Sequence, residues 1–126
     1  MHANNITREN IETMVLSFYR KILKDDTVGP FFVAKLGDDM SNEYWEPHLE
    51  LLINFWSSMM LGDGSYRGNP FAPHMSLGEL KSEVFERWLK LFFETLDEIY
   101  EPQVADVFKE RSTIIAGNFM RNLRIV

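Results

Sequence analysis

The chain has 126 residues, of which 45% are hydrophobic, so one domain spanning residues 1–126 with a substantial buried core is expected. Its formal net charge of −6, without a basic stripe, argues against nucleic acid or an anionic membrane surface as a partner. Because cysteine is absent, disulfides, iron–sulfur clusters and zinc–thiolate sites are excluded.

The first predicted helix begins after Thr7, a good N-cap residue. Apolar side chains then recur with helical spacing on one face over residues 11–23. The helix is predicted to end near Lys24-Asp25-Asp26, and Val28-Gly29-Pro30 prevents its continuation. Pro30 can open a short second helix, which Gly37 is expected to close.

A third helix is predicted to carry Pro47 near its start and to end at Leu61, before Gly62. Its apolar stripe includes one histidine, which is expected on the buried side. The stripe consists of His48, Leu51, Leu52, Phe55, Trp56, Met59 and Met60. A loop of about a dozen residues follows, and loops this long are often functional.

Two more helices complete a predicted all-α fold. A capping box at residues 76–79 starts a helix that extends to about Tyr100, and its wide apolar arc indicates a central position. Pro102 opens the last helix. Its inward-facing residues are predicted to be Val104, Val107, Phe108, Ile115, Phe119 and Leu123.

The sequence also bears on the location of the protein. No apolar run approaches the roughly 20 residues that a membrane-spanning helix needs. The polar segment 1–8 does not have the character of a signal peptide. A cytoplasmic location is therefore expected.

Two side chains place a polar group on an apolar helix face. Tyr19 lies on the innermost face of the first helix, where an unpaired hydroxyl would cost roughly 1–3 kcal/mol, so a partner is expected. Trp88 places an indole N–H in the middle of the central helix. Each residue taken alone also fits an ordinary core position.

A histidine follows the proline-rich turn between two apolar segments. His74 comes directly after Pro73, and a neutral imidazole held by a stiff turn beside an apolar cavity is what haem iron requires of its proximal ligand. The chain's ten Phe, four Tyr and three Trp suit a core that encloses a flat apolar group. A well-packed core without a cofactor fits the same composition, and His48 alone is more typical of a core histidine.

Longer motifs distributed along the chain resemble the truncated haemoglobins, and most closely their group III. The resemblance covers residues 6–123 approximately. The matching motifs are Phe18-Tyr19, Gly29-Pro30-x-Phe32, Trp45-x-x-His48, Asn54-Phe55-Trp56, Met60-Leu61-Gly62-x-Gly64-x-Tyr66-x-Gly68-x-Pro70, His74, Phe85-x-x-Trp88-Leu89-x-Leu91-Phe92 and Arg111-x-x-x-Ile115-Ala116-x-x-Phe119.

The resemblance implies a truncated globin fold, a two-over-two helical sandwich around haem b, and it assigns roles by position. His74 corresponds to the proximal ligand of the iron. Tyr19 and Trp88 correspond to distal hydrogen-bond donors, and His48 corresponds to the residue that gates the distal pocket. Phe32 corresponds to the phenylalanine that stacks on the haem. The apolar stripes of the helices add Leu52, Phe55 and Phe92 to the expected lining of the pocket. Tyr66, Arg67 and Lys35 are candidates to meet the propionates, because carboxylates favour nearby cations and donors.

The function that the resemblance implies is binding of O₂, and of CO and NO, at a five-coordinate iron, with an electron donor or reductase as partner. Two distal donors would slow the release of O₂, so chemistry with NO or peroxide is expected rather than O₂ transport. The sequence leaves open whether the protein is an enzyme, such as an NO dioxygenase or a peroxidase. Two alternatives remain: a bis-histidine electron-transfer haem protein using His48 and His74, and a cofactor-free helical interaction domain.

Overall fold

The computed structural model describes residues 2–62, 64 and 82–122, without the side chains of residues 35, 82, 119, 120 and 122. Over these ranges the chain forms the α-helices α1 (Arg8–Lys24), α2 (Gly29–Leu36), α3 (Trp45–Leu61), α5 (Ser82–Ile99) and α6 (Pro102–Asn122). An isolated parallel bridge between Ala3 and Tyr100 is the β-structure found in this part of the chain. None of the helices described is long and apolar enough to cross a membrane.

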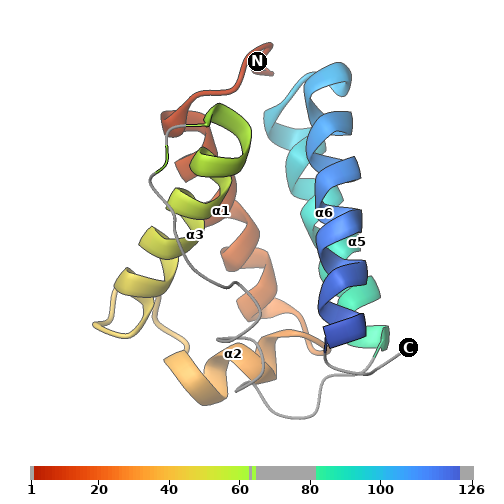
Figure 1. Cartoon of the computed structure of the whole chain (residues 1–126). Coiled ribbons are helices and arrows are strands. Elements are labelled where there is room, and N and C mark those ends of the chain that lie inside the picture. Colours follow the sequence, from red (N-terminus) through yellow and green to blue (C-terminus); the bar gives the residue numbers. More distant parts are fainter. Residues whose placement is uncertain (1, 63, 65–81, 123–126) are drawn as a thin grey trace.

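The helices form two packed pairs. α1 packs against α3, α5 packs against α6, and contact between α1 and α5 joins the pairs, while α2 packs against α1. Figure 1 shows α3 and α6 on the near side of the molecule, with α1 and α5 behind them and α2 crossing below. The all-α, two-over-two arrangement predicted from the sequence is confirmed.

The predicted cap of α1 forms and is joined to the distant α5–α6 turn. The Thr7 hydroxyl accepts the Asn10 N–H at 3.1 Å, and the Asn10 side chain accepts the Thr7 N–H at 3.0 Å, which is a capping box. The same Asn10 oxygen accepts the Tyr100 hydroxyl at 2.7 Å. Beside it, the Ala3 N–H donates to the Ile99 carbonyl at 2.9 Å. These bonds fix one end of the α1–α5 interface.

Two of the predicted core positions are wrong. Leu51 on α3 is 38% exposed and Val107 on α6 is 43% exposed. An amphipathic helix buries only the arc that faces its neighbours, and these two side chains lie outside that arc. The buried positions that the predicted stripes of the third and last helices omitted are Trp45, Leu49 and Ser57 on α3 and Ala105, Ser112 and Ala116 on α6. The predicted capping box at 76–79, the Phe119 side chain and Leu123 lie outside the described residues.

Gly29 begins α2 at a point where the backbone passes close to α1. A Cβ atom on Gly29 would lie 2.7 Å from the carbonyl oxygen of Ile22 and 3.3 Å from that of Leu23. Because these neighbours are backbone atoms, Gly29→Ala is expected to lower the free energy of unfolding by about 1–3 kcal/mol. Urea denaturation of the two proteins measures the difference.

Gly117→Ala is the matched control for this substitution. Gly117 lies inside α6, and a Cβ atom there would meet no described atom within 4 Å. The better helix propensity of alanine should raise the free energy of unfolding by about 0.5–1 kcal/mol. Equal effects of the two substitutions would contradict the close approach at Gly29.

Candidate functional site

Tyr19 lies at the centre of a cluster of aromatic rings. Its side chain on α1 is 2% exposed. The Tyr19 ring centroid lies 5.0 Å from that of Phe18, 5.4 Å from Phe32 on α2, 5.6 Å from Trp45 and 5.3 Å from His48 on α3. All four contacts are edge-to-face, the arrangement that aromatic quadrupoles favour. Three helices therefore converge on one phenol.

α5 adds further rings to this cluster. The Trp88 ring lies 5.4 Å from Phe18 and is stacked on Phe92, also at 5.4 Å. Phe92 is in turn stacked against Trp56 of α3 at 5.3 Å. The sequence predicted Phe92, Trp88 and Tyr19 for one pocket, and the structure places all three in a continuous set of ring contacts through Phe18.

The environment of Tyr19 keeps its phenol neutral. Burial raises the pKa of Tyr19 above its ordinary value, and a hydrogen bond with the Trp88 side chain acts in the opposite direction. An indole N–H can only donate, so Trp88 is the donor and the Tyr19 oxygen the acceptor. A protonated phenol that accepts one hydrogen bond still has its own O–H to donate to another group. The partner predicted for the buried hydroxyl is therefore present.

His48 faces the same cluster from α3. Its ring lies 5.4 Å from that of Trp45 and 6.0 Å from that of Phe32, and its Nε2 atom is buried. Trp45 is fully buried, and its indole N–H donates to the Gly37 carbonyl at 2.8 Å, which ties the start of α3 to the end of α2. The predicted stripe of α3 began at His48 and missed Trp45. The i, i+3 spacing of the two residues was the signal that could have included it.

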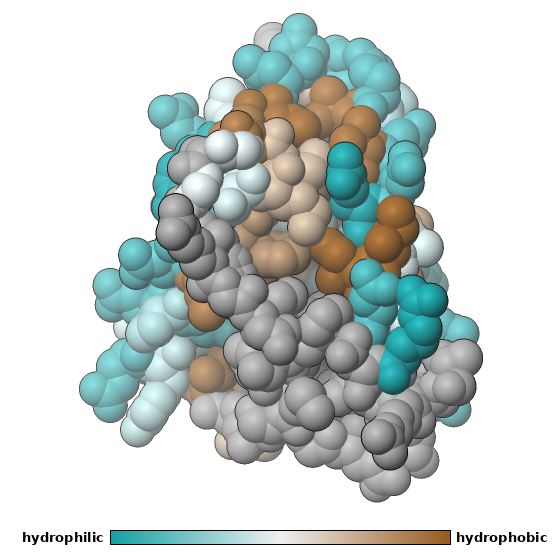
Figure 2. Space-filling view, in the orientation of Figure 1, coloured by the Kyte–Doolittle hydropathy of each residue, from teal (hydrophilic) through white to brown (hydrophobic). Residues whose placement is uncertain are grey.

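Leu52 and Phe55, also predicted for the pocket, lie partly buried further along α3. Phe55 makes an edge-to-face contact with Trp56 at 5.5 Å. Figure 2 shows apolar side chains gathered on the face between α3 and α6. The partly buried apolar residues of these two helices are Leu52, Ile53, Phe55, Met59, Met60 and Ile115.

Four predicted site residues have side chains outside the part of the chain that the structure describes. His74, Tyr66 and Arg67 lie outside the described residues, as does the side chain of Lys35. Among the side chains that are described, no group of three or more His, Cys, Asp or Glu could hold a metal ion. The described part of the site is therefore a cluster of aromatic rings that includes a phenol, an indole N–H and an imidazole.

Comparison with known proteins identifies the family. No family model matches the chain. The group 3 truncated haemoglobin ctb of Campylobacter jejuni is 37% identical over 123 residues, which cover 98% of this chain and 95% of that protein. The crystal structure of a group III truncated haemoglobin from Campylobacter jejuni matches the fold with a TM-score of 0.89 and 37% identity, over 98% of this chain and 95% of the other. With a relative this similar along nearly its whole length and the same arrangement of helices, the chain belongs to the truncated haemoglobins, in their group III.

Proposed function

We propose that the protein binds haem b between its two helix pairs and takes up O₂ or another diatomic ligand in the pocket around Tyr19. The observation that carries this proposal is the buried, neutral Tyr19 phenol, with the Trp88 indole and the His48 imidazole beside it. Membership of the truncated haemoglobins supports the presence of haem in this protein. The Campylobacter jejuni relative is itself named a haemoglobin.

The residues present fit this cofactor. The rings of Phe32, Phe55 and Phe92, with Leu52, supply apolar surface suited to a flat macrocycle. The absence of cysteine rules out thioether attachment, so the haem would be held without a covalent bond to its vinyl groups.

Residues outside the described ranges complete the proposed cofactor site. His74 would supply the imidazole that binds the iron. Tyr66 and Arg67 would meet the propionates, because carboxylates are stabilised by nearby cations and hydrogen-bond donors. These assignments rest on the family resemblance of the sequence.

Haem, when bound, supplies an iron atom that takes O₂, CO or NO at its open position. The protein's contribution is to place a donor beside that position and to exclude water from it. Trp88 donates to the oxygen of Tyr19, which leaves the Tyr19 O–H to donate to the ligand. The surrounding rings keep the pocket apolar, and His48 stands at the polar edge, where it can gate entry.

These donors favour retention of the ligand over its rapid release. A hydrogen bond to a charged or strongly polarised acceptor contributes about 1.5–3 kcal/mol, so the bond from the Tyr19 O–H, which Trp88 orients, slows dissociation roughly ten- to hundredfold. A transport protein must unload, which such slow release opposes. We therefore favour turnover of the ligand with NO or peroxide, as in an NO dioxygenase or a peroxidase, supported by an electron donor.

The absorption spectrum of the purified protein, with and without CO, tests the proposal. The expected result is a Soret band in the ferric protein, a five-coordinate ferrous form, and a shift of that form on addition of CO. A low-spin ferrous spectrum that does not respond to CO would instead indicate iron bound by both His48 and His74. A colourless protein of full stability, with no Soret band after titration with hemin, would overturn the haem proposal.

A further inference from the structure

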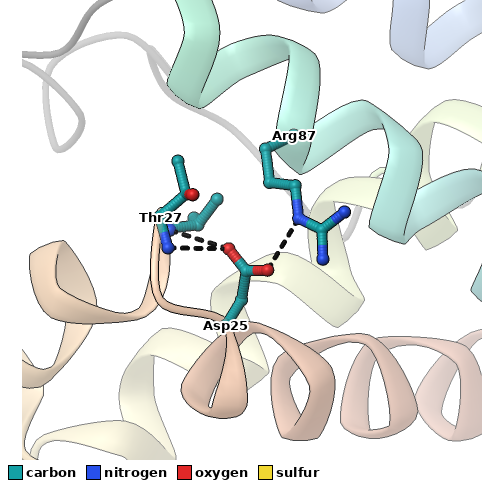
Figure 3. Close-up of polar contacts among 4 residues, drawn as sticks. Asp25, Thr27 and Arg87 are labelled. Carbon is teal, nitrogen blue, oxygen red and sulfur yellow. Dashed lines mark hydrogen bonds and ion pairs between the residues drawn. The ribbon is translucent and has the colours of Figure 1, made fainter.

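The carboxylate of Asp25 joins three helices at one corner of the fold (Figure 3). One of its oxygens accepts the N–H groups of Thr27 and Val28 at 3.1 and 3.0 Å, and the other accepts the Arg87 Nε–H at 2.7 Å. Asp25 ends α1, Thr27 and Val28 lead into α2, and Arg87 belongs to α5. The Asp25 side chain is 7% exposed and the Arg87 side chain 37% exposed, so the carboxylate is shielded from water while the guanidinium is partly solvated.

Hydrogen bonds from both backbone and side chain keep the Asp25 carboxylate charged. Burial alone would raise the pKa of Asp25, but the hydrogen bonds from Val28, Arg87 and Thr27 outweigh it and lower that pKa below its ordinary value. The carboxylate is therefore ionised near neutral pH. Because two backbone N–H groups hold one of its oxygens, it cannot easily follow a displaced Arg87.

Each helix joined at this corner contributes a ring to the pocket. α1 carries Tyr19 and α2 carries Phe32, whose ring lies 5.4 Å from that of Tyr19. α5 carries Trp88, the residue directly after Arg87. The Asp25–Arg87 pair therefore links the helices that carry Tyr19, Phe32 and Trp88.

Ring contacts and hydrogen bonds also join α1 and α5 away from this corner. The helices run antiparallel, with Phe18 against Phe92 between the corner and the far end. Trp88 itself makes an edge-to-face contact with Phe18 and a stacked contact with Phe92, and these contacts also orient its ring. The directional bond from Tyr100 to Asn10 lies at the far end, and Tyr100 is roughly 18 Å from Trp88 along the helix at 1.5 Å per residue.

We propose that Asp25 and Arg87 are a positioning pair, which holds the Trp88 indole N–H against the Tyr19 phenol and thereby sets how firmly the pocket retains a diatomic ligand. Neither residue of the pair needs to touch that ligand. The effect on ligand retention rests on the proposed function, whereas the effect on the position of Trp88 does not.

The test is Arg87→Gln, with Asp25→Asn as a second variant of nearly unchanged shape. The first measurement is the indole N–H signal of Trp88 in the NMR spectrum of ¹⁵N-labelled protein, carrying CO-bound ferrous haem if haem is present. The chain has three tryptophans, so Trp88→Phe assigns the signal by its loss. In both variants the Trp88 signal is expected to shift, whereas that of Trp45, bonded to Gly37, is expected to remain in place.

Two matched controls separate positioning from loss of stability or charge. Tyr100→Phe removes a directional bond at the far end of the same helix interface, and Lys21→Gln removes the exposed ion pair with Glu98 between the same two helices. Neither is expected to move the Trp88 signal. Arg87→Lys keeps the charge without the planar guanidinium, and it is expected to give a smaller shift than Arg87→Gln.

The second measurement is the rate of O₂ dissociation, which is expected to increase about three- to tenfold in Arg87→Gln as the contact between Trp88 and Tyr19 loosens.

An unshifted Trp88 signal in folded Arg87→Gln and Asp25→Asn, or an equal shift in Tyr100→Phe, would overturn the positioning role. A shifted signal with unchanged dissociation would overturn the link to retention. If the protein bound no haem, the proposed function would fail, and the indole signal would still decide the positioning role.

Discussion

His74→Ala is expected to abolish stable haem binding. The imidazole is the only protein bond to the iron in the proposed site, and the remaining contacts to the macrocycle would be apolar or to its propionates. The effect should be the largest of any single substitution in the chain. The measurement is the haem stoichiometry of the purified variant, from its Soret absorbance per protein, together with the ferrous spectrum.

His48→Ala is the control for this experiment. Because His48 is placed among the rings of Tyr19, Trp45 and Phe32, it is expected to gate the pocket rather than to anchor the cofactor. Its replacement should leave the haem stoichiometry and the five-coordinate ferrous form unchanged. A His74→Ala protein with full stoichiometry and a five-coordinate ferrous spectrum would refute the proximal assignment. Loss of a low-spin spectrum in His48→Ala would favour the bis-histidine alternative.

Helix ends were predicted from the sequence because the residues that set them act locally. Thr7 caps α1, Gly37 caps α2, and Gly62 caps α3 with a left-handed φ of 66°. A side-chain cap or a residue that tolerates positive φ works through neighbours a few positions away. Such signals can be identified from the sequence alone, because they do not depend on how the helices pack against one another.

The side chains that a helix buries depend on which neighbours cover it, and here prediction was less complete. Leu51 continues an apolar stripe in the sequence but lies outside the arc that the neighbours of α3 cover, whereas Trp45 lies inside it. The sequence alone did not supply the direction from which α1 approaches. The family resemblance assigned Tyr19, His48 and Trp88 to one site, and their rings lie in one cluster of contacts in the structure. A motif carries such spatial proximity, which helical periodicity cannot supply.

The ion pair between Asp25 and Arg87 is a contact that could not be predicted from the sequence. The two residues are separated by 62 positions, and each is an ordinary charged residue in its own segment. Only the antiparallel packing of α1 on α5 brings them to 2.7 Å. Long-range polar contacts of this kind require the register between helices, which depends on the whole core.

The double substitution Tyr19→Phe with Trp88→Phe is expected to speed O₂ dissociation at least tenfold, about 1.4 kcal/mol of lost stabilisation or more. Both replacements keep an aromatic ring, so the contacts of Phe18 with the two rings are largely retained while both polar hydrogens are lost. Stopped-flow displacement of O₂ by CO measures the rate. Unchanged kinetics would remove the proposed donor role of both residues.

The single variants show how the two donors are coupled. If Trp88 acts mainly by orienting the Tyr19 hydroxyl, Trp88→Phe should have little further effect once Tyr19 is phenylalanine, and a double-mutant cycle will show a non-additive term of about 0.5–3 kcal/mol. Trp56→Phe is the matched control, since Trp56 also stacks on Phe92 but lies outside the direct ring contacts of Tyr19. If Trp56→Phe accelerated dissociation as much as Trp88→Phe, the effect would come from altered packing around Phe92, and the hydrogen bond between Trp88 and Tyr19 would not be its cause.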